Sequence, residues 1–421
     1  MVSDLSVRGV RDFYPKDFSV LKKIFDAWRN TALSYGFEEF EAPILETLEL
    51  YKIKSGEEIV NQLYCFKDKS GRDLALRPEL TPSLARMVAK VHSQLSKPIK
   101  WFSIPRCFRY EKPQKGRLRE FFQFNVDIIG QEEGLADLEV ISLAIDSLCA
   151  LGLTENDFVV KINNRNFVSG LFEDSGIDEE RIQRLYKIID ASRKLPEDEV
   201  TRRIDELRLN NKQYSVVDNY LKIKGFDGLK NFDIENEGKS SLIKLGEYIN
   251  YAGLAPFCDF DPTIVRGLDY YTGIVFEIYD RSEKLRAICG GGRYDNLLEA
   301  LSGIKIPACG FGMGDVVLSE VLKEKGLLEP DKRRVDYFVV RVSENELAQM
   351  LRLVRALRKK GFVVDYSYSS AGVKKQLSRA SRLNARFAII VGEDELREGM
   401  VVEKNLDTGE QKKVPLERIL G

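Results

Sequence analysis

The sequence is almost without histidine, because His92 is the single one among 421 residues. A Ser-His-Asp triad needs a histidine with a nucleophile and a carboxylate paired around it, and nothing near His92 suggests either. The six cysteines are scattered and form no CxxC pair, which argues against a structural zinc site and for a reducing compartment. Arginines, carboxylates and a metal ion must therefore carry whatever chemistry the protein performs.

Excess charge and long apolar runs are absent as well. The chain has 65 basic and 66 acidic residues, so a nucleic-acid surface has to be a local patch rather than a global field. No apolar run is long enough to span a bilayer and no signal-peptide pattern is present, so we expect a cytoplasmic protein with no membrane contact. The length of 421 residues, 43% of them hydrophobic and 31% charged, predicts a soluble chain of two or three domains.

Residues 106–130 carry the densest polar pattern. Polar and apolar residues alternate in the second half of this stretch, and Pro and Gly stand between its two halves. This pattern predicts two antiparallel strands joined by a basic loop at 112–119. The polar face of this hairpin suits a charged small molecule, and its basic loop suits phosphates. A solvated hairpin explains this stretch equally well. One face of the predicted hairpin carries a cation, an amide and two carboxylates: Arg109, Glu111, Gln123 and Asp127.

The segment FRYEKPQKGRLREFFQ, residues 108–123, resembles motif 2 of the class II aminoacyl-tRNA synthetases, and its form is similar to that of the histidyl-tRNA synthetase family. The resemblance implies an α+β catalytic domain with an antiparallel sheet, with histidine, ATP, Mg²⁺ and tRNA(His) as the molecules bound. It also implies roles in this hairpin: Arg109 at the α-phosphate, Glu111 and Arg117 at ATP, Lys115 and Arg119 at tRNA, and Gln123 and Asp127 at the histidine ring.

An amphipathic helix capped by Asp17 or Ser19 and closed by Gly36 is expected near the start of the chain. A strand-like stretch, residues 37–46, follows, and Pro43 within it marks an edge or an interface. The pair resembles motif 1 of the class II enzymes, which builds their dimer interface, although a plain helix followed by a strand fits equally. The resemblance implies a homodimer.

Residues 73–88 predict a strand, at 73–77, followed by a helix that starts at Thr81 or Ser83. Glu79 and Thr81 either cap that helix or project into a site from the connection. The segment resembles the Leu-Arg-Pro-Glu-x-Thr peptide of the histidyl-tRNA synthetase family, which supplies a carboxylate and a hydroxyl for the α-amine of the substrate. We therefore expect Glu79 and Thr81 to bind that amine.

Residues 262–280 predict a strand rising from a turn at Gly267 and Gly273. The segment resembles the Arg-Gly-x-Asp-Tyr-Tyr peptide that distinguishes the histidyl-tRNA synthetase family. This implies that Arg266 stands where charge develops at the α-phosphate and that two tyrosines contact the histidine ring. Those tyrosines are Tyr270 and Tyr271.

The segment CGGGRYD, residues 289–295, places three glycines in a row, which gives a backbone that a ligand can approach closely. Tyr294 matches a further position of the family's histidine pocket. Residues 307–322 resemble motif 3, in which glycines alternate along a strand that enters a helix. The usual Gly-x-Glu-Arg is missing, because Val316 and Val317 stand at the last two places. We expect Arg117, with Mg²⁺, to bind the terminal phosphate instead; the alternative is that water and metal suffice and Arg117 contacts only tRNA.

Changes in composition and residue pattern along the chain predict a catalytic domain, 1–325, with a helical insertion at about 164–257, and a C-terminal α/β domain, 333–421. The C-terminal domain resembles the anticodon-binding domain of class IIa synthetases. Its second predicted helix carries a basic stripe that fits either a solvated face or a phosphate backbone. The stripe consists of Lys375, Arg379, Arg382 and Arg386.

The resemblance as a whole implies an aminoacyl-tRNA ligase that converts histidine and ATP to histidyl-adenylate and passes the histidyl group to the 3′ end of tRNA(His). Two alternatives are a catalytically inactive regulatory subunit of histidine biosynthesis and a tRNA-binding factor without catalysis. The missing motif 3 arginine is the one feature that favours the last of these. A pyrophosphate-exchange assay separates the three.

Overall fold

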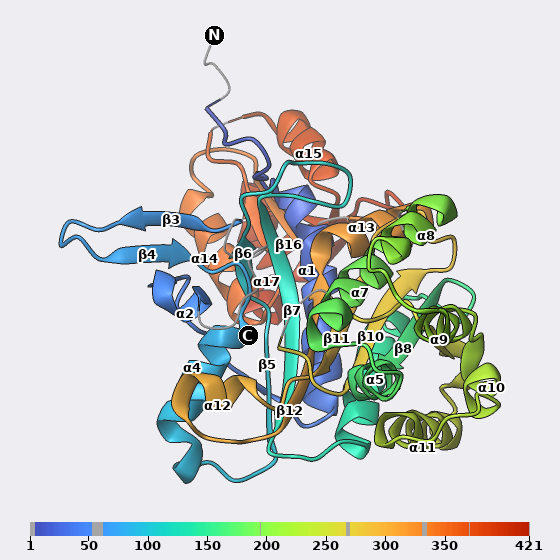
Figure 1. Ribbon diagram of the computed structural model, residues 1–421. Helices are drawn as coiled ribbons and strands as arrows, with labels where there is room; N and C mark the ends of the chain where they lie inside the picture. Colours follow the sequence, from blue (N-terminus) through green and yellow to red (C-terminus); the bar gives the residue numbers. More distant parts are fainter. Residues whose placement is uncertain are drawn as a thin grey trace. The chain divides into compact units, whose positions relative to one another are not determined.

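The computed structural model describes residues 5–52, 62–193, 195–266, 270–330, 335–369 and 371–420. The expected turn residue Gly267 lies outside these ranges. The chain divides into two compact units, Met1–Glu329 and Pro330–Gly421 (Figure 1). Among the helices of the described residues, none combines the length and the apolarity that crossing a membrane requires.

The first unit is built on a sheet to which the described residues contribute nine strands, in the order β1-β5-β7-β12-β11-β10-β8-β9, with β6 paired to β7. The pairs β1-β5 and β8-β9 at the two edges are parallel, and the pairs between them are antiparallel. The expected α+β catalytic fold on an antiparallel sheet is thereby confirmed. The strands are β1 (Glu38–Glu39), β5 (Ile99–Ser103), β6 (Arg106–Phe108), β7 (Glu120–Ile129), β8 (Phe158–Asn164), β9 (Cys258–Phe260), β10 (Ile274–Asp280), β11 (Cys289–Arg293) and β12 (Ala308–Gly314).

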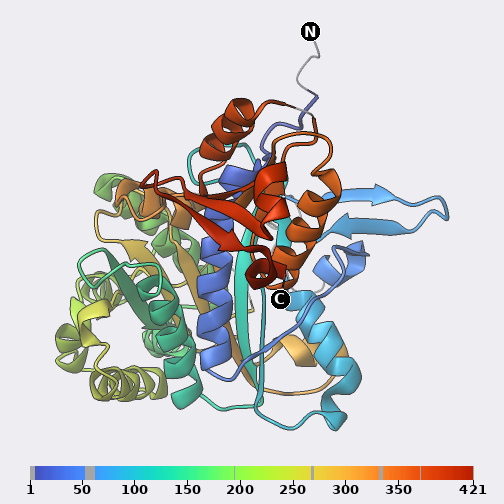
Figure 2. The same cartoon turned by 180° about the vertical axis from the view of Figure 1, so that it is seen from behind.

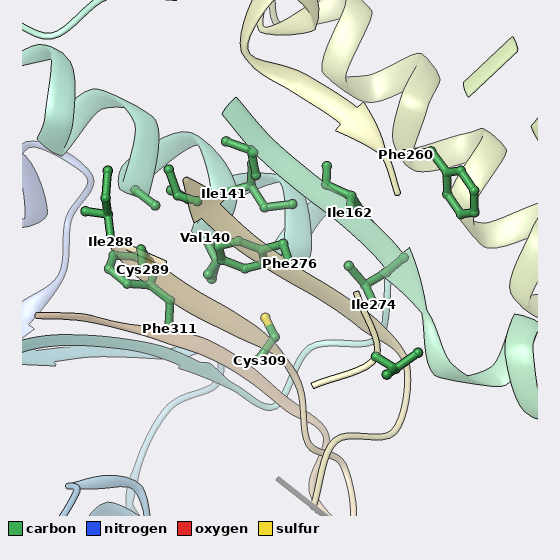
Figure 3. Close-up of a cluster of buried hydrophobic side chains, with 14 of the residues drawn as sticks. Val140, Ile141, Ile162, Phe260, Ile274, Phe276, Ile288, Cys289, Cys309 and Phe311 are labelled. Carbon is green, nitrogen blue, oxygen red and sulfur yellow. The ribbon is translucent and has the colours of Figure 1, made fainter. Parts of the chain in front are cut away.

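Two helices, α1 (Pro15–Ser34) and α5 (Leu135–Cys149), cover one face of this sheet, and Figure 2 shows α1 (blue) running alongside β7 (teal). Trp28 of α1 stacks on Phe124 of β7 with ring centres 5.3 Å apart. Val140 and Ile141 of α5 pack over side chains of β10, β11 and β12 (Figure 3). Since alternate residues of a strand point to opposite faces, Gln123, Asn125 and Asp127 are directed to the other face.

The helical insertion consists of helices between β8 and β9, and Figure 1 shows α9, α10 and α11 gathered beyond β8. Because β8 and β9 are hydrogen-bonded neighbours, the insertion leaves and re-enters the sheet at the same edge. Leu242, Leu245 and Ile249 of its last helix join the main core. The helices are α6 (Arg165–Asp174), α7 (Glu179–Ser192), α8 (Glu197–Asp205), α9 (Asn211–Leu221), α10 (Gly225–Lys230) and α11 (Glu237–Tyr251), followed by the 3₁₀ turn η2 (Ala255–Phe257).

A separate three-stranded sheet, β2-β4-β3, was not anticipated from the sequence. The strand expected at 37–46 is divided at Pro43, because β1 joins the large sheet and β2 joins this small one. The elements here are β2 (Leu45–Thr47), α2 (Leu48–Lys52), β3 (Tyr64–Lys67), β4 (Asp73–Leu76), α4 (Thr81–Val91), η1 (His92–Gln94) and α12 (Leu297–Ser302), with α13 (Asp315–Glu324) following β12.

Of the two expected helix starts, the first is corrected and the second is confirmed. Helix α1 begins at Pro15, earlier than Asp17 or Ser19, because proline is favoured in the first helical turn, and Tyr14 takes the cap position without a side-chain bond. Helix α4 has Leu80 at its cap position. Thr81 is therefore the first helical residue, as expected, and the alternative that Thr81 caps the helix is wrong.

The second unit contains a five-stranded sheet in the order β14-β13-β15-β16-β17 within the described residues. The strands β14, β13 and β15 are parallel, and β15, β16 and β17 are antiparallel. The expected α/β architecture is present. Its elements are β13 (Val335–Arg341), α14 (Leu347–Lys359), β14 (Val364–Tyr366), α15 (Val373–Arg382), β15 (Ala385–Val391), α16 (Glu393–Arg397), β16 (Met400–Asn405), β17 (Gln411–Pro415) and α17 (Leu416–Leu420).

Candidate active site

A cavity of about 730 Å³ lies in the first unit on the sheet face directed away from α1 and α5. Its floor comes from β7, β10, β11 and β12, and its rim comes from the β6–β7 loop and the connection before α4. Segments as far apart in the sequence as Glu79 and Val317 meet there. The residues expected at a site that line it are Glu79, Thr81, Arg109, Glu111, Lys115, Arg117, Gln123, Asp127, Arg266, Tyr270, Tyr271 and Tyr294.

Glycines on β11 and β12 leave space at the floor of this cavity, because they have no side chain. A Cβ atom added at Gly310 would collide with Oδ1 of Asp127, and one added at Gly290 would collide with Nη1 of Arg266. The expected close approach of a ligand to the glycine backbone is therefore only part of the explanation. These glycines make room for the side chains of the site itself.

Asp127 lies at the bottom of the cavity and is 3% exposed. Tyr294 Oη donates to its Oδ1, while its Oδ2 is buried without a hydrogen-bond partner among the described residues. Burial raises the pKa of Asp127 to about 7, against the hydrogen bond from Tyr294, which lowers it. Oε1 of Gln123, on the same face of β7, is also buried without a partner in this part of the chain. Buried acceptors are costly unless bonded, so two acceptors here are set for the donors of a ligand.

Aromatic rings and a carboxylate form the neighbouring wall. The ring centre of Tyr270 lies 4.8 Å from that of Tyr271 and 5.9 Å from that of Tyr294. Tyr270 Oη donates to Oε2 of Glu79 at 3.3 Å. Glu79 and Thr81 are 5% and 8% exposed. A polar ligand with a ring would therefore contact aromatic faces and hydrogen-bonded carboxylates at the same time.

Arg266 stands at the edge of this wall with an unusual backbone, because its φ is 58° although it is not a glycine. Its Nη1 donates to Glu277, and its guanidinium carbon lies 5.4 Å from the ring centre of Tyr271. A side chain in the left-handed region costs on the order of 1–3 kcal/mol and persists where the surroundings require it. The cation is thereby held over the floor.

A second arginine, Arg109, projects from the motif 2 hairpin. Its Nε donates to the carbonyl oxygen of Pro78 at 3.0 Å, and its guanidinium carbon lies 5.2 Å from the centre of the Phe121 ring. The backbone bond and the ring fix the plane of the guanidinium. The cavity therefore has cations on two different elements.

The loop between β6 and β7 closes over Val317. Nε of Arg117 lies 2.9 Å from Oε2 of Glu111, which orients both side chains at the cavity. A Cβ atom added at Gly116 would lie 3.4 Å from Cγ2 of Val317. The tip of the loop thus lies beside the position that usually carries the motif 3 arginine, and Lys115 next to it pairs with Glu324 at 3.3 Å.

Arg119 is the one motif 2 residue of the expected set that does not line the cavity. Its Nε donates to the carbonyl oxygen of Glu111 at 3.1 Å, and its guanidinium carbon lies 4.6 Å from the ring centre of Tyr110. Its backbone N–H donates to the carbonyl oxygen of Gly9 at 2.8 Å. In this structure Arg119 therefore fixes the base of the loop.

The basic stripe belongs to the second unit and is shorter than expected. Lys375, Arg379 and Arg382 lie on α15, but Arg386 lies on β15 because the helix ends at Arg382. The turn is made by Asn384, whose φ of 53° stops the helix. The guanidinium carbon of Arg379 lies 5.7 Å from the ring centre of Tyr368.

Several cavity residues were not singled out from the sequence. Asn125, Glu277 and Tyr279 follow the period-two alternation of β7 and β10, so that signal was present. Arg193 comes from the helical insertion, and no local pattern marks it. Within the described ranges, no cluster of three or more histidine, cysteine, aspartate or glutamate side chains is arranged to hold a metal ion.

Known proteins match this chain along its whole length. The family model for histidyl-tRNA synthetase matches residues 9–315, and a model for an anticodon binding domain matches residues 336–421. A curated histidine–tRNA ligase of Opitutus terrae is 40% identical, over 100% of this chain and 98% of its own length.

Solved structures agree as well. The crystal structure of histidyl-tRNA synthetase from Nostoc sp. PCC 7120 superposes with a TM-score of 0.82 at 27% identity, covering 100% of this chain and 99% of the other. A Bacillus halodurans structure described as an ATP phosphoribosyltransferase regulatory subunit/histidyl-tRNA synthetase gives 0.78 at 25% identity, over 93% of this chain and 99% of the other. With matching sequence models for both units and a relative of this identity along its full length, the chain belongs to the histidyl-tRNA synthetase family.

Proposed function

We propose that this protein is a histidine–tRNA ligase, which joins histidine to ATP as histidyl-adenylate and then passes the histidyl group to the 3′ end of tRNA(His). One observation carries the proposal. The buried acceptors Asp127 Oδ2 and Gln123 Oε1 lie without partners in the described residues, beside the tyrosine wall and in a cavity that Arg109 and Arg266 also line. This combination suits an imidazole ring on one side and a phosphate on the other.

Each end of histidine has a matching group. Asp127 and Gln123 hydrogen-bond to the ring nitrogens, while Tyr270, Tyr271 and Tyr294 surround the ring; Glu79 and Thr81 bind the α-ammonium group. A site that hydrogen-bonds a polar ring rejects apolar isosteres strongly, because its own buried groups would be left unpaired.

Adenylate formation needs countercharge more than a nucleophile from the protein. A carboxylate oxygen of histidine attacks the α-phosphorus, its new bond forms as the bond to pyrophosphate breaks, and negative charge builds up on the α-phosphate. Arg109 and Arg266 stand where they stabilise that charge, and fixed cations of this kind are the main source of such rate enhancement. Orientation by the ammonium and ring contacts supplies the remainder.

Mg²⁺ enters as part of the substrate, MgATP. Two carboxylates of the cavity, Glu111 and Glu277, are each bound to an arginine, and the described residues hold no cluster arranged to bind a metal ion. This fits an ion that takes its ligands from phosphate oxygens and water. Arg117, at the loop tip beside Val317, binds the terminal phosphate in place of the missing motif 3 arginine.

The tRNA contacts extend over both units. Lys115 and Arg119 in the β6–β7 loop serve the acceptor end, and Lys375, Arg379 and Arg382 on α15 serve the anticodon region. The match of the second unit to an anticodon binding domain supports this division. The protein acts as a homodimer in the cytoplasm, and its six free cysteines suit that reducing compartment.

ATP–pyrophosphate exchange with each standard amino acid tests the proposal. Exchange that depends on histidine alone is the expected result. No exchange with any amino acid would overturn it and would leave the regulatory subunit of histidine biosynthesis or a non-catalytic tRNA-binding factor. The second unit argues against the former, and the complete Arg266 and tyrosine cluster argues against both.

A further inference from the structure

The helical insertion reaches the cavity through two of its described residues, Asp190 near the end of α7 and Arg193 just after it. Arg193 is not a solvated charge, since its side chain is 15% exposed. Its guanidinium contacts two segments that lie more than sixty residues further along the chain. Both segments lead to Arg266.

The first segment starts at Asp261. Nη1 of Arg193 lies 3.0 Å from Oδ2 of Asp261 and 3.3 Å from Oγ1 of Thr263. Asp261 in turn accepts a hydrogen bond of 2.9 Å from the backbone N–H of Thr263. Two buried residues, Ile264 and Val265, then lead directly into Arg266. Arg193 therefore fixes the start of the segment that leads to Arg266, the residue with the left-handed backbone.

The second segment is β10 and the turn after it. Nη2 of Arg193 donates to Glu283, and its guanidinium carbon lies 4.2 Å from the ring centre of Tyr279. Tyr279 Oη donates to one carboxylate oxygen of Glu277, and the other oxygen accepts from Arg266. A continuous path of contacts thus joins Arg193 to the guanidinium of Arg266.

We propose that Arg193 is a positioning residue for Arg266, through which the helical insertion sets the rate of histidine activation. The inference rests on the proposed function, in which Arg266 stabilises charge at the α-phosphate. Arg193 holds Arg266 from the backbone side through Asp261 and Thr263, and from the side-chain side through Tyr279 and Glu277. Without Arg193, Arg266 keeps its charge and its contacts with Glu277 and Tyr271, but the two segments that carry these contacts are held less firmly.

Histidine-dependent ATP–pyrophosphate exchange by the full chain tests this. Arg193→Ala should lower kcat about 10- to 100-fold, because a misplacement of about 1 Å has effects of that size. The KM values for histidine and ATP should stay within about twofold, since Arg193 acts on the transition state and not on ground-state binding. The matched control is Arg202→Ala on α8. Arg202 has a side chain that is 60% exposed and pairs with its helix neighbours Glu199 and Glu206; the kcat of this variant should be unchanged.

A double variant separates positioning from general damage. Once Arg266→Ala has removed the arginine to be oriented, adding Arg193→Ala should change exchange by less than about twofold. A full further loss in that background would overturn the inference, as would an unchanged kcat in Arg193→Ala alone. If Arg193→Ala fails to fold, Tyr279→Phe, which removes only the hydroxyl on Glu277, should lower kcat in the same way. Failure of the proposed function looks different, because the unmodified chain would then show no histidine-dependent exchange.

Discussion

At the scale of single residues, Asp127 shows how a binding pocket affects the stability of the empty protein. Its carboxyl group ionises at a pKa of about 4 in an unfolded chain, whereas burial raises the pKa to about 7 in the folded one. The folded state therefore holds the proton more tightly. The resulting contribution to stability is complete below about pH 4 and is lost as the pH rises through about 7.

Asp127→Asn should remove this pH dependence, because an amide stays neutral. Between about pH 5 and about pH 8, the free energy of unfolding of the variant should rise relative to that of the unmodified chain by about 3 kcal/mol. Urea unfolding of both proteins without ligand, at the two pH values, measures the difference. An equal difference at both values would contradict the raised pKa.

Arg266→Ala should reduce histidine-dependent exchange by about 10²–10³, since it removes one fixed cation from the charge that develops on the α-phosphate. The fold and tRNA binding should remain, which thermal unfolding and a tRNA-binding assay would verify. The control is Arg202→Ala, which removes an exposed cation that does not line the cavity. Exchange at the unmodified rate would remove Arg266 from the proposed mechanism.

At the scale of elements, the β6–β7 loop carries the consequence of the missing motif 3 arginine. Val317 cannot bind a phosphate, and the loop tip at Gly116 lies against it. Arg117 lines the cavity next to this position and is oriented by Glu111. The loop therefore brings a cation from motif 2 to the place where motif 3 has none.

Arg117→Ala should raise the KM for ATP about tenfold or more, the effect of losing one charge-assisted hydrogen bond. Pyrophosphate exchange without tRNA gives this value free of any acceptor-end contact. Lys112→Ala serves as the control, because Lys112 lies exposed in the same loop and does not line the cavity. A KM equal to that of the unmodified protein would mean that water and metal suffice at the terminal phosphate.

How much of an element the sequence reveals depends on its pattern. The alternation in β7 predicted both the strand and the face that carries Gln123 and Asp127, because one side must be apolar to pack on Trp28. Strand β3 has no such alternation, since three of its four residues are exposed, and so its small sheet was missed. Arg193 was missed for another reason, because its role depends on contacts between segments that only folding brings together.

At the scale of the whole molecule, the two compact units divide at Glu329, between the domains expected at 1–325 and 333–421. The cavity lies entirely in the first unit and the α15 stripe entirely in the second. The proposed function thus assigns chemistry on histidine and ATP to the first unit and recognition of the anticodon to the second. The two activities should be separable.

A chain that ends at Glu329 should keep most of its histidine-dependent exchange and lose most of its aminoacylation of tRNA(His). The first unit contains the complete cavity, whereas Lys375, Arg379 and Arg382 are removed. Exchange and tRNA charging are measured on the same preparation, with the full chain as reference. Charging by the shortened chain at the full rate would show that the second unit does not read the anticodon.

The glycines of the cavity floor bear on how amino-acid specificity changes. The side chain at position 127 and the missing side chain at position 310 share one volume, although they belong to different strands, β7 and β12. Mutations at one of the two positions alone therefore give few new pocket shapes, because any side chain at position 310 would occupy the space that the side chain at position 127 needs. A directed-evolution library for a ligase that accepts another amino acid therefore has to vary the two strands together.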